Sequence, residues 1–247
     1  RVSECFFEFI NLIMKFAPLG AFGSVAYAVG SNGTAVLMSL ANLVLMFYVA
    51  VFLFITIVLG AVCRLSGFSL WRFLKYIKDE VSIVLGTASS ESALPRLLLK
   101  LEKLGCSKQS VGLVLPTGYA FNLDGTSIYM SLCVLFIANA YGVPLSWEQQ
   151  LGMVAIMLVT SKGAAAVSGG SFVVFAATVT AIGVLPVEGL ALLFGVYRFM
   201  SMAIATCNTI GNSVATVVVA KWAGEFSEQT AKEEYERVLG RRAAPAL

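Results

Sequence analysis

Residues 110–140 read SVGLVLPTGYAFNLDGTSIYMSLCVLFIANA, an apolar segment whose middle is the polar sequence NLDGT at 122–126. The segment is longer than the roughly 20 helical residues that cross a hydrocarbon core of about 30 Å. Its polar insert consists of turn-forming residues that should unwind a helix. Because unwound backbone at membrane depth is tolerated only beside protein or a water-filled cavity, the stretch predicts a discontinuous transmembrane helix at an internal site.

The composition agrees with a membrane protein. Hydrophobic residues make up 58% of the 247 residues and charged residues 13%, whereas roughly a quarter of a soluble domain is charged. These values and a net charge of only +3 exclude a water-soluble globule and a disordered, fibrous or nucleic-acid-binding protein. Five cysteines without histidine favour neither a zinc site nor a disulfide framework, and the lack of histidine disfavours an enzyme.

Two apolar stretches precede the broken segment. They run from about Cys5 to Val29 and from about Ala35 to Cys63, with a turn-forming Ser-Asn-Gly sequence between them. We expect both to span the membrane, so that residues 1–74 comprise two transmembrane helices and a cytoplasmic connection. Because the chain starts with Arg1 and no signal-peptide pattern precedes the first stretch, we expect the C-terminal portion of a longer protein.

Two further apolar segments are interrupted by polar or small residues, at 87–92 and at 161–171. Each interruption leaves halves of roughly ten residues, which are too short to cross a membrane but suit re-entrant helical hairpins. We expect an all-α, multi-pass membrane protein with a transport domain over 75–221 and a cytoplasmic tail over 222–247. The expected parts of the transport domain are hairpin 1 at about 75–105, a broken helix at 107–140, hairpin 2 at about 147–183 and a last helix at 185–221.

The basic residues support this topology. All of the 17 Lys and Arg residues except Lys15, Lys162 and Arg198 fall in connections on one side of the expected membrane or in the tail. The positive-inside rule therefore predicts a cytoplasmic C-terminus. The two hairpin-plus-helix units then enter from opposite faces, which is typical of the inverted repeats of secondary transporters, whose discontinuous helices meet near the midplane.

Two polar clusters are candidate binding sites. Ser89, Ser90, Glu91 and Ser92 supply hydroxyls and free N–H groups that could hold a carboxylate, the alternative being a helix N-cap. The oxygens of Asn122, Asp124 and Thr126 could coordinate a hard cation, the alternative being an ordinary loop.

The second interruption and the last helix also carry candidates. Lys162 could snorkel to the interface, pair with Glu91 or Asp124, or contact substrate. Ser201, Ala205, Asn208 and Asn212 share one helical face that should point at the site, with interhelical hydrogen bonding as the alternative. Cys207 is interpreted as a packing residue.

Four motifs in this order resemble one family. They are GTASSESALP at 86–95, PTGYAFNLDGT at 116–126, SKGAA at 161–165 and NTIGN at 208–212. The chain closely resembles the dicarboxylate/amino acid:cation symporters, the glutamate-transporter-like carriers, and most nearly the bacterial C4-dicarboxylate transporters. The resemblance covers essentially the whole chain and corresponds to a longer member from its fifth span onward.

The resemblance implies an elevator-type secondary active symporter, usually a homotrimer, in a bacterial inner membrane. It implies a carboxylate substrate, by default a C4-dicarboxylate such as succinate, fumarate or malate, and no cofactor beyond a sodium ion. The substrate-binding residues implied are Ser89, Ser90, Thr126, Gly163, Ala165, Gly169, Ser201 and Asn208. The cation-binding residues implied are Asn122, Asp124, Asn208 and Asn212.

The chain departs from the family pattern where the charge of a substrate is recognised. Tyr197 stands where the family commonly has Asp, and Ile204 stands where it has the Arg that pairs with a second carboxylate. Ser201 replaces the Asp that holds the amine in amino-acid carriers. A monocarboxylate, a neutral substrate or an amino acid therefore stays an alternative, as do an anion-conducting channel and an inactive relative. With Asn212 and Tyr197 in place of acidic ligands, proton and sodium coupling are both open.

Overall fold

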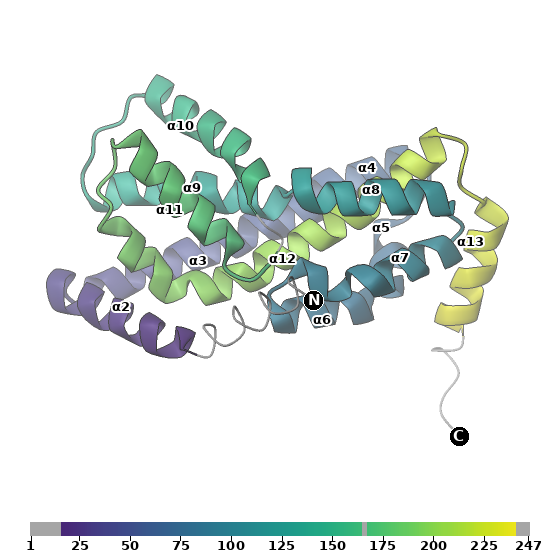
Figure 1. Ribbon diagram of the computed structural model, residues 1–247, viewed down its shortest axis with the longest axis horizontal. Helices are drawn as coiled ribbons and strands as arrows, with labels where there is room; N and C mark the ends of the chain where they lie inside the picture. Colours follow the sequence, from purple (N-terminus) through teal and green to yellow (C-terminus); the bar gives the residue numbers. More distant parts are fainter. Residues whose placement is uncertain (1–15, 165–166, 241–247) are drawn as a thin grey trace, which may run out of the picture.

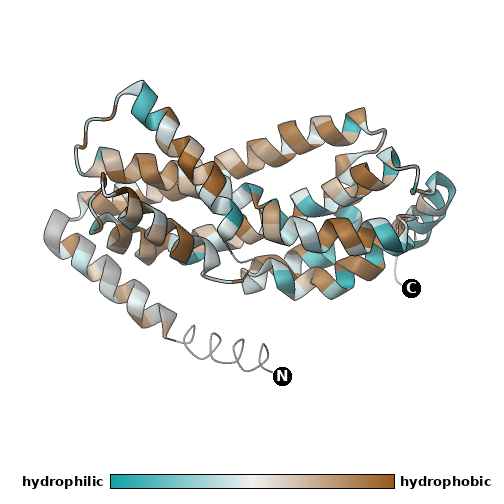
Figure 2. Cartoon of the chain, turned by 45° about the horizontal axis from the view of Figure 1, so that its top comes forward, coloured by the Kyte–Doolittle hydropathy of each residue, from teal (hydrophilic) through white to brown (hydrophobic). Residues whose placement is uncertain are grey.

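A computed structural model describes residues 16–164 and 167–240 of the chain (Figure 1). The described residues are almost all helical and form no strand, which confirms the predicted all-α class. Three helical stretches among them are long and apolar enough to cross a membrane, at Ala35–Leu65, Lys108–Ala140 and Gly189–Trp222. The ribbon of these helices is coloured mostly as hydrophobic, and hydrophilic residues gather near the C-terminal end of the chain (Figure 2).

The N-terminal part contains two long helical stretches. The first expected span lies partly outside the described residues, and its described part forms α2 (Ala17–Asn32). The second is continuous from α3 (Ala35–Leu53) through a π-helical turn, η1 (Phe54–Leu59), to α4 (Gly60–Leu65). Short α5 (Leu70–Tyr76) follows, and the Ser69 side chain caps its N-terminus.

Hairpin 1 consists of two short helices with a non-helical tip. Helix α6 (Lys78–Thr87) ends at Ala88, whose φ of 54° makes it the one non-glycine residue with positive φ in the described segments. A 3-10 turn, η2 (Ser90–Ala93), then leads into α7 (Leu94–Lys103). Pro95 lies in the first turn of α7, where its missing N–H breaks no helical hydrogen bond.

Hairpin 2 has the same design. Helix α10 (Trp147–Thr160) starts with a capping box formed by Ser146 and Gln149. It ends in a 3-10 turn, η3 (Ser161–Gly163), and the chain returns through α11 (Gly170–Ile182). The two hairpins extend from opposite ends of the molecule, and their tips approach one another in its middle (Figure 1).

The expected broken helix at 107–140 is indeed broken, but over a shorter stretch than predicted. Helix α8 (Lys108–Phe121) and helix α9 (Asp124–Ala140) are separated only by residues 122–123. The prediction that the chain is unwound as far as Thr126 is therefore wrong, because residues 124–126 form the first turn of α9. An acidic residue is favourable in a first turn, where it faces the positive end of the helix dipole.

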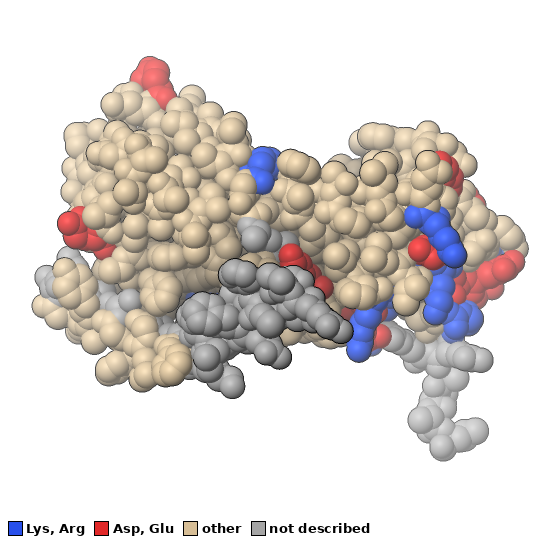
Figure 3. Space-filling model, viewed as in Figure 1, with Lys and Arg blue, Asp and Glu red and all other residues tan. Residues whose placement is uncertain are grey.

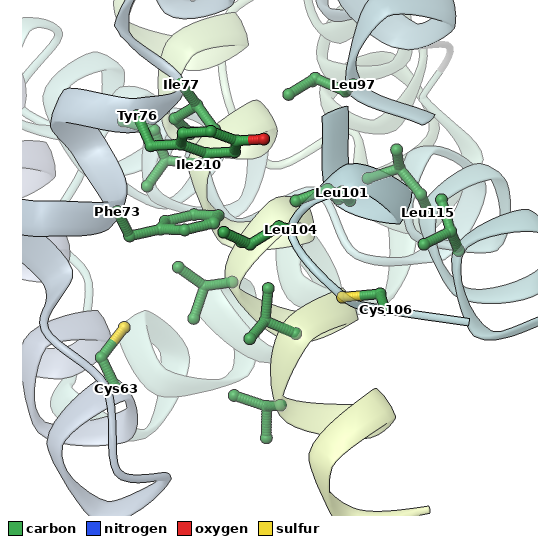
Figure 4. Close-up of a cluster of buried hydrophobic side chains, with 14 of the residues drawn as sticks. Cys63, Phe73, Tyr76, Ile77, Leu97, Leu101, Leu104, Cys106, Leu115 and Ile210 are labelled. Atoms are coloured by element: carbon green, nitrogen blue, oxygen red, sulfur yellow. The ribbon is translucent and has the colours of Figure 1, made fainter. Parts of the chain in front are cut away.

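Helix α12 (Gly189–Trp222) runs through the centre of the molecule and is contacted by α2, α3, α6, α8 and α9. Most of its 34 residues are therefore at least partly buried. One apolar cluster surrounds its C-terminal half and includes Tyr76, Leu101, Leu104 and Ile210 (Figure 4). A second cluster surrounds its N-terminal half and joins it to α9 and to hairpin 2.

The end of the molecule beyond the first cluster is polar. Helix α13 (Glu228–Tyr235) and a π-helical turn, η4 (Glu236–Gly240), fold back against α5 and α7. Residues 105–107 and 225–227 also pair through backbone hydrogen bonds. Lys and Arg side chains gather at this end (Figure 3). The charged segment 226–240 is thus docked against the rest of the described chain.

Candidate functional site

The candidate site lies in the middle of the molecule, where the two hairpin tips and the break between α8 and α9 meet α12. Hairpin 1 contacts α12 through Ser90, whose Oγ donates to the Ala205 carbonyl over 3.1 Å. Hairpin 2 contacts α9 through the hydroxyls of Ser171 and Thr126, which are 2.9 Å apart. Residues from the four predicted segments are therefore brought together at one place, although hairpin 2 is represented by Ser171, which was not predicted.

Asn208 on α12 organises the start of α9. Its Oδ1 accepts a hydrogen bond from the Gly125 N–H at 2.7 Å, and its Nδ2 donates to Thr126 Oγ1 at 3.3 Å. The first N–H groups of a helix have no partner within the helix, so this side chain acts as a cap supplied by a distant segment. Gly125 is required for the contact, because a Cβ there would lie 2.6 Å from the Ile204 carbonyl oxygen.

The predicted cation-binding residues form a second contact group beside the break. Asn122 Nδ2 donates to Asn212 Oδ1 at 3.1 Å and lies 3.4 Å from Asp124 Oδ2. Asp124 packs against Gly211, where any Cβ would overlap its carboxylate. The structure thus places one carboxylate and two amides together, with no group of three or more Cys, Asp and Glu ligands among the described residues.

Several buried polar atoms at this level have no hydrogen-bond partner among the described residues. Asn212 Nδ2 on α12 is one of them; Thr209 Oγ1 and Tyr119 Oη also lack a well-formed hydrogen bond, although these two hydroxyls lie within reach of each other. An unpartnered buried polar group costs about 1–3 kcal/mol, so such groups call for a ligand or another partner. The position of Asn212 Nδ2 beside Asn122 and Asp124 fits a site for a small polar ligand or ion.

The serines of hairpin 1 divide between two roles. Ser90 is buried and bonded to α12, whereas Ser92 donates to the Ser89 carbonyl at 2.7 Å and lies 2.9 Å from the Thr87 hydroxyl. Ser92 therefore stabilises the turn and is not the N-cap of α7, which is Ala93. Ser89 stands at the tip in extended conformation.

The described part of the hairpin 2 tip combines buried residues, Ser161 and Ala164, with open glycines. Gly163 has open space around it, and Gly169 adopts a left-handed conformation with φ of 93° just before α11. Ala165 lies outside the described residues. Lys162 is exposed and forms no ion pair with either predicted partner in the described segments, although Asp124 lies within range of its charge.

The N-terminal part of the predicted polar face of α12 carries other groups than the amides and carboxylate at the helix break. Ser201 is buried, and the Tyr197 hydroxyl faces both Ser201 and Ser171 near the start of α11. Ile204 is 3% exposed and belongs to the apolar cluster that includes Tyr129. This side of the site thus offers neutral hydroxyls and an aliphatic surface.

Arg198 is the residue that sequence reasoning left unassigned. Its guanidinium reaches both hairpin tips, with Nη2 3.3 Å from the Gly86 carbonyl, and Nη1 3.5 Å from the Thr87 carbonyl and from Ser168 Oγ. The available signal was its charge, because an arginine inside a transmembrane helix is expensive and commonly functional.

Comparison with known proteins identifies relatives of the chain. The model of the sodium:dicarboxylate symporter family matches residues 1–222. "C4-dicarboxylate transport protein 2" of Pseudomonas paraeruginosa strain PA7 is 53% identical over 234 residues, which are 95% of this chain and 54% of the relative. "C4-dicarboxylate transport protein" of Bacillus subtilis strain 168 is 52% identical over 96% of this chain and 56% of its own length. The chain spans about half the length of the curated relatives it matches. These names describe transporters and not enzymes, in agreement with the prediction.

Proposed function

This chain belongs to the sodium:dicarboxylate symporter family, and from that premise we propose that the protein containing it is a secondary active symporter. Its substrate would be a carboxylate, with C4-dicarboxylates first because the relatives are named for them. The coupling ion would be sodium or a proton. A homotrimer with an elevator movement of residues 75–221, in a bacterial inner membrane and with a cytoplasmic C-terminus, completes the proposal.

The observation that carries this proposal is the group of polar residues held between two hairpin tips and two helices. Discontinuous helices that meet near the membrane midplane commonly form the substrate and ion sites of secondary transporters. The unpartnered Asn212 Nδ2 beside Asn122 and Asp124 supports a ligand at this point.

We assign roles to the residues by their place in this group. Asp124 would be the main anionic cation ligand because it is the carboxylate at the helix break, with Asn122, Asn212 and Asn208 as amide ligands. Ser90 and Thr126 would bind substrate from hairpin 1 and α9. The remaining proposed substrate-binding residues are Ser89, Gly163, Ala165, Gly169, Ser201 and Asn208.

The experiment is uptake into vesicles by the full gene product that contains these residues. Radiolabelled succinate should accumulate above its outside concentration when a sodium or a proton gradient is imposed, and not without one. Each gradient is imposed alone, so that the coupling ion is identified. Downhill equilibration without accumulation would instead indicate an anion-conducting channel and refute the symporter.

A monocarboxylate is the second candidate substrate, and Ile204 is the observation that favours it. An aliphatic side chain cannot pair with a second carboxylate, so a dianion bound there would need another positive charge. Uptake of succinate and lactate by the same vesicles would distinguish the two candidates.

A further inference from the structure

Arg198 is placed where neither its own helix nor the packing of the core accounts for its charge. It lies nine residues after the start of α12, about 14 Å along a helix that is long enough to cross a membrane. No carboxylate of the described residues forms an ion pair with its guanidinium. Its side chain is exposed on the described chain, and a charged residue at membrane depth commonly faces a water-filled cavity or pairs with an opposite charge.

The hydrogen bonds of the guanidinium are long and incomplete. Its three contacts measure 3.3–3.5 Å, beyond the usual 2.7–3.2 Å for N–H···O bonds. Two acceptors are the last carbonyls of α6, which an arginine could cap for structural reasons alone. Nε has no described partner, so donors of the planar fork stay available for a bidentate contact with a carboxylate.

The position of Arg198 relative to the other site residues suits a dianion. Residues 198 and 205 lie on the same face of α12, seven residues or about 10 Å apart. The tip of hairpin 1 covers this face, because Gly86 meets Arg198 and Ser90 meets Ala205. An extended four-carbon dicarboxylate places its carboxylate carbons about 4 Å apart, the span of three bonds in trans. With the reach of an arginine side chain, both ends can be bound along this face.

Among the described residues of the site, no other cation has hydrogen bonds with both hairpin tips as Arg198 does. The site includes hydroxyls, amides, the Asp124 carboxylate and the aliphatic side chain of Ile204, and the tip of hairpin 1 adds a second carboxylate, Glu91. Lys162, the other cation near a hairpin tip, has Asp124 within range of its charge and so lies toward the proposed cation site.

We propose that Arg198 binds one carboxylate of a dianionic substrate, while Thr126, Asn208 and the tip of hairpin 1 bind the other. This assignment rests on the proposed transport function. Arg198 would exchange its long contacts to Gly86, Thr87 and Ser168 for a bidentate contact with the substrate, and would thereby make the site selective for dicarboxylates despite Ile204.

The test compares two substrates of equal length in the full gene product. Succinate carries two charges and monomethyl succinate carries one. Arg198→Gln should raise the KM for succinate by about tenfold to a hundredfold and leave that for monomethyl succinate within about twofold. Arg198→Lys should fall between, because a lysine keeps the charge but lacks the fork. Arg64→Gln, the same exchange at an exposed residue outside the site, is the matched control and should change neither KM.

The contrary outcomes are distinct. Equal losses for both substrates, with Arg198→Gln present in the membrane at the normal level, would mean that Arg198 only caps α6 and would overturn the assignment. Unchanged uptake of both would overturn it as well. If the unaltered protein accumulates monomethyl succinate but not succinate, the dicarboxylate function itself fails, and the assignment fails with it.

Discussion

The end of the molecule around α13 and the site in its middle both bury polar side chains, but they satisfy them differently. At the α13 end, Glu80 pairs with Lys100 at 2.5 Å, and Glu225 accepts from Ser107 and Ser110 at 2.5 and 2.6 Å. Glu234 accepts from Tyr76 at 3.0 Å and from Arg237 at 2.7 Å. Each of these carboxylates is satisfied within the described chain.

In the middle of the molecule, some polar groups have no such partner. Asn212 Nδ2 is buried without a described partner, and Arg198 has no carboxylate partner among the described residues. Folding alone would select against such groups, since each costs about 1–3 kcal/mol. The difference supports the proposal that polar groups at the α13 end hold the structure together, whereas those in the middle bind ligands.

The strongest test of this difference between the two regions is to remove one carboxylate from each. Asp124→Asn should lower succinate uptake about a hundredfold or more, because it removes the one carboxylate at the helix break and leaves only amides for a cation. Glu234→Gln should leave uptake within about threefold, because it alters a contact of α13 far from the site. Initial rates, normalised to the protein in the membrane, measure both effects. Similar losses for the two variants would contradict the division of roles.

A smaller effect is expected from glycines on one helix. A Cβ at Gly118 would overlap Asn212 Oδ1, which is held in place by Asn122, whereas a Cβ at Gly112 would meet no described atom within 4 Å. Gly118→Ala should therefore destabilise the protein by about 1–3 kcal/mol, and Gly112→Ala should be neutral or stabilise it by up to about 1 kcal/mol. Thermal unfolding in detergent measures both. Equal melting temperatures would show that the packing of α8 on α12 is not tight at the site.

The middle of the molecule is the part that the sequence predicts best. Polar and small residues inside apolar segments are rare, so the breaks near 88, 122 and 161 could be located without a structure. The extent of each break could not, because it depends on distant contacts. Residues 124–126 are helical in part because Asn208, 83 residues away from Gly125, caps the start of α9.

The α13 end is the part that the sequence predicts least. Its charges indicate a tail, but the pairing of Glu225 with Ser107 joins residues 118 positions apart, and no local pattern announces it. The contacts of Arg198 with both hairpin tips are hidden for the same reason, since Gly86 and Thr87 lie more than 110 positions before it. Periodicity identifies helices and breaks, whereas the partners of a polar side chain follow from the tertiary fold.

The smallest expected effect concerns acid pH at the α13 end. The hydrogen bond from Arg237, with a further one from Tyr76, holds the pKa of Glu234 below its ordinary value. A carboxylate whose pKa is lower in the folded than in the unfolded state stabilises the fold above the unfolded pKa, near 4.3 for Glu, and loses this contribution as the pH falls through the folded pKa. Hydrogen exchange in residues 228–240, corrected for intrinsic rates, should therefore rise by about tenfold or less between pH 7 and pH 3.

Glu234→Gln should exchange faster already at pH 7 and respond less to acid, because the titrating group is gone, while Gly112→Ala should respond as the unaltered protein does. An identical acid response with and without Glu234 would assign it to another group, of which Glu225 is the nearest candidate, since hydrogen bonds from Ser107 and Ser110 also lower its pKa.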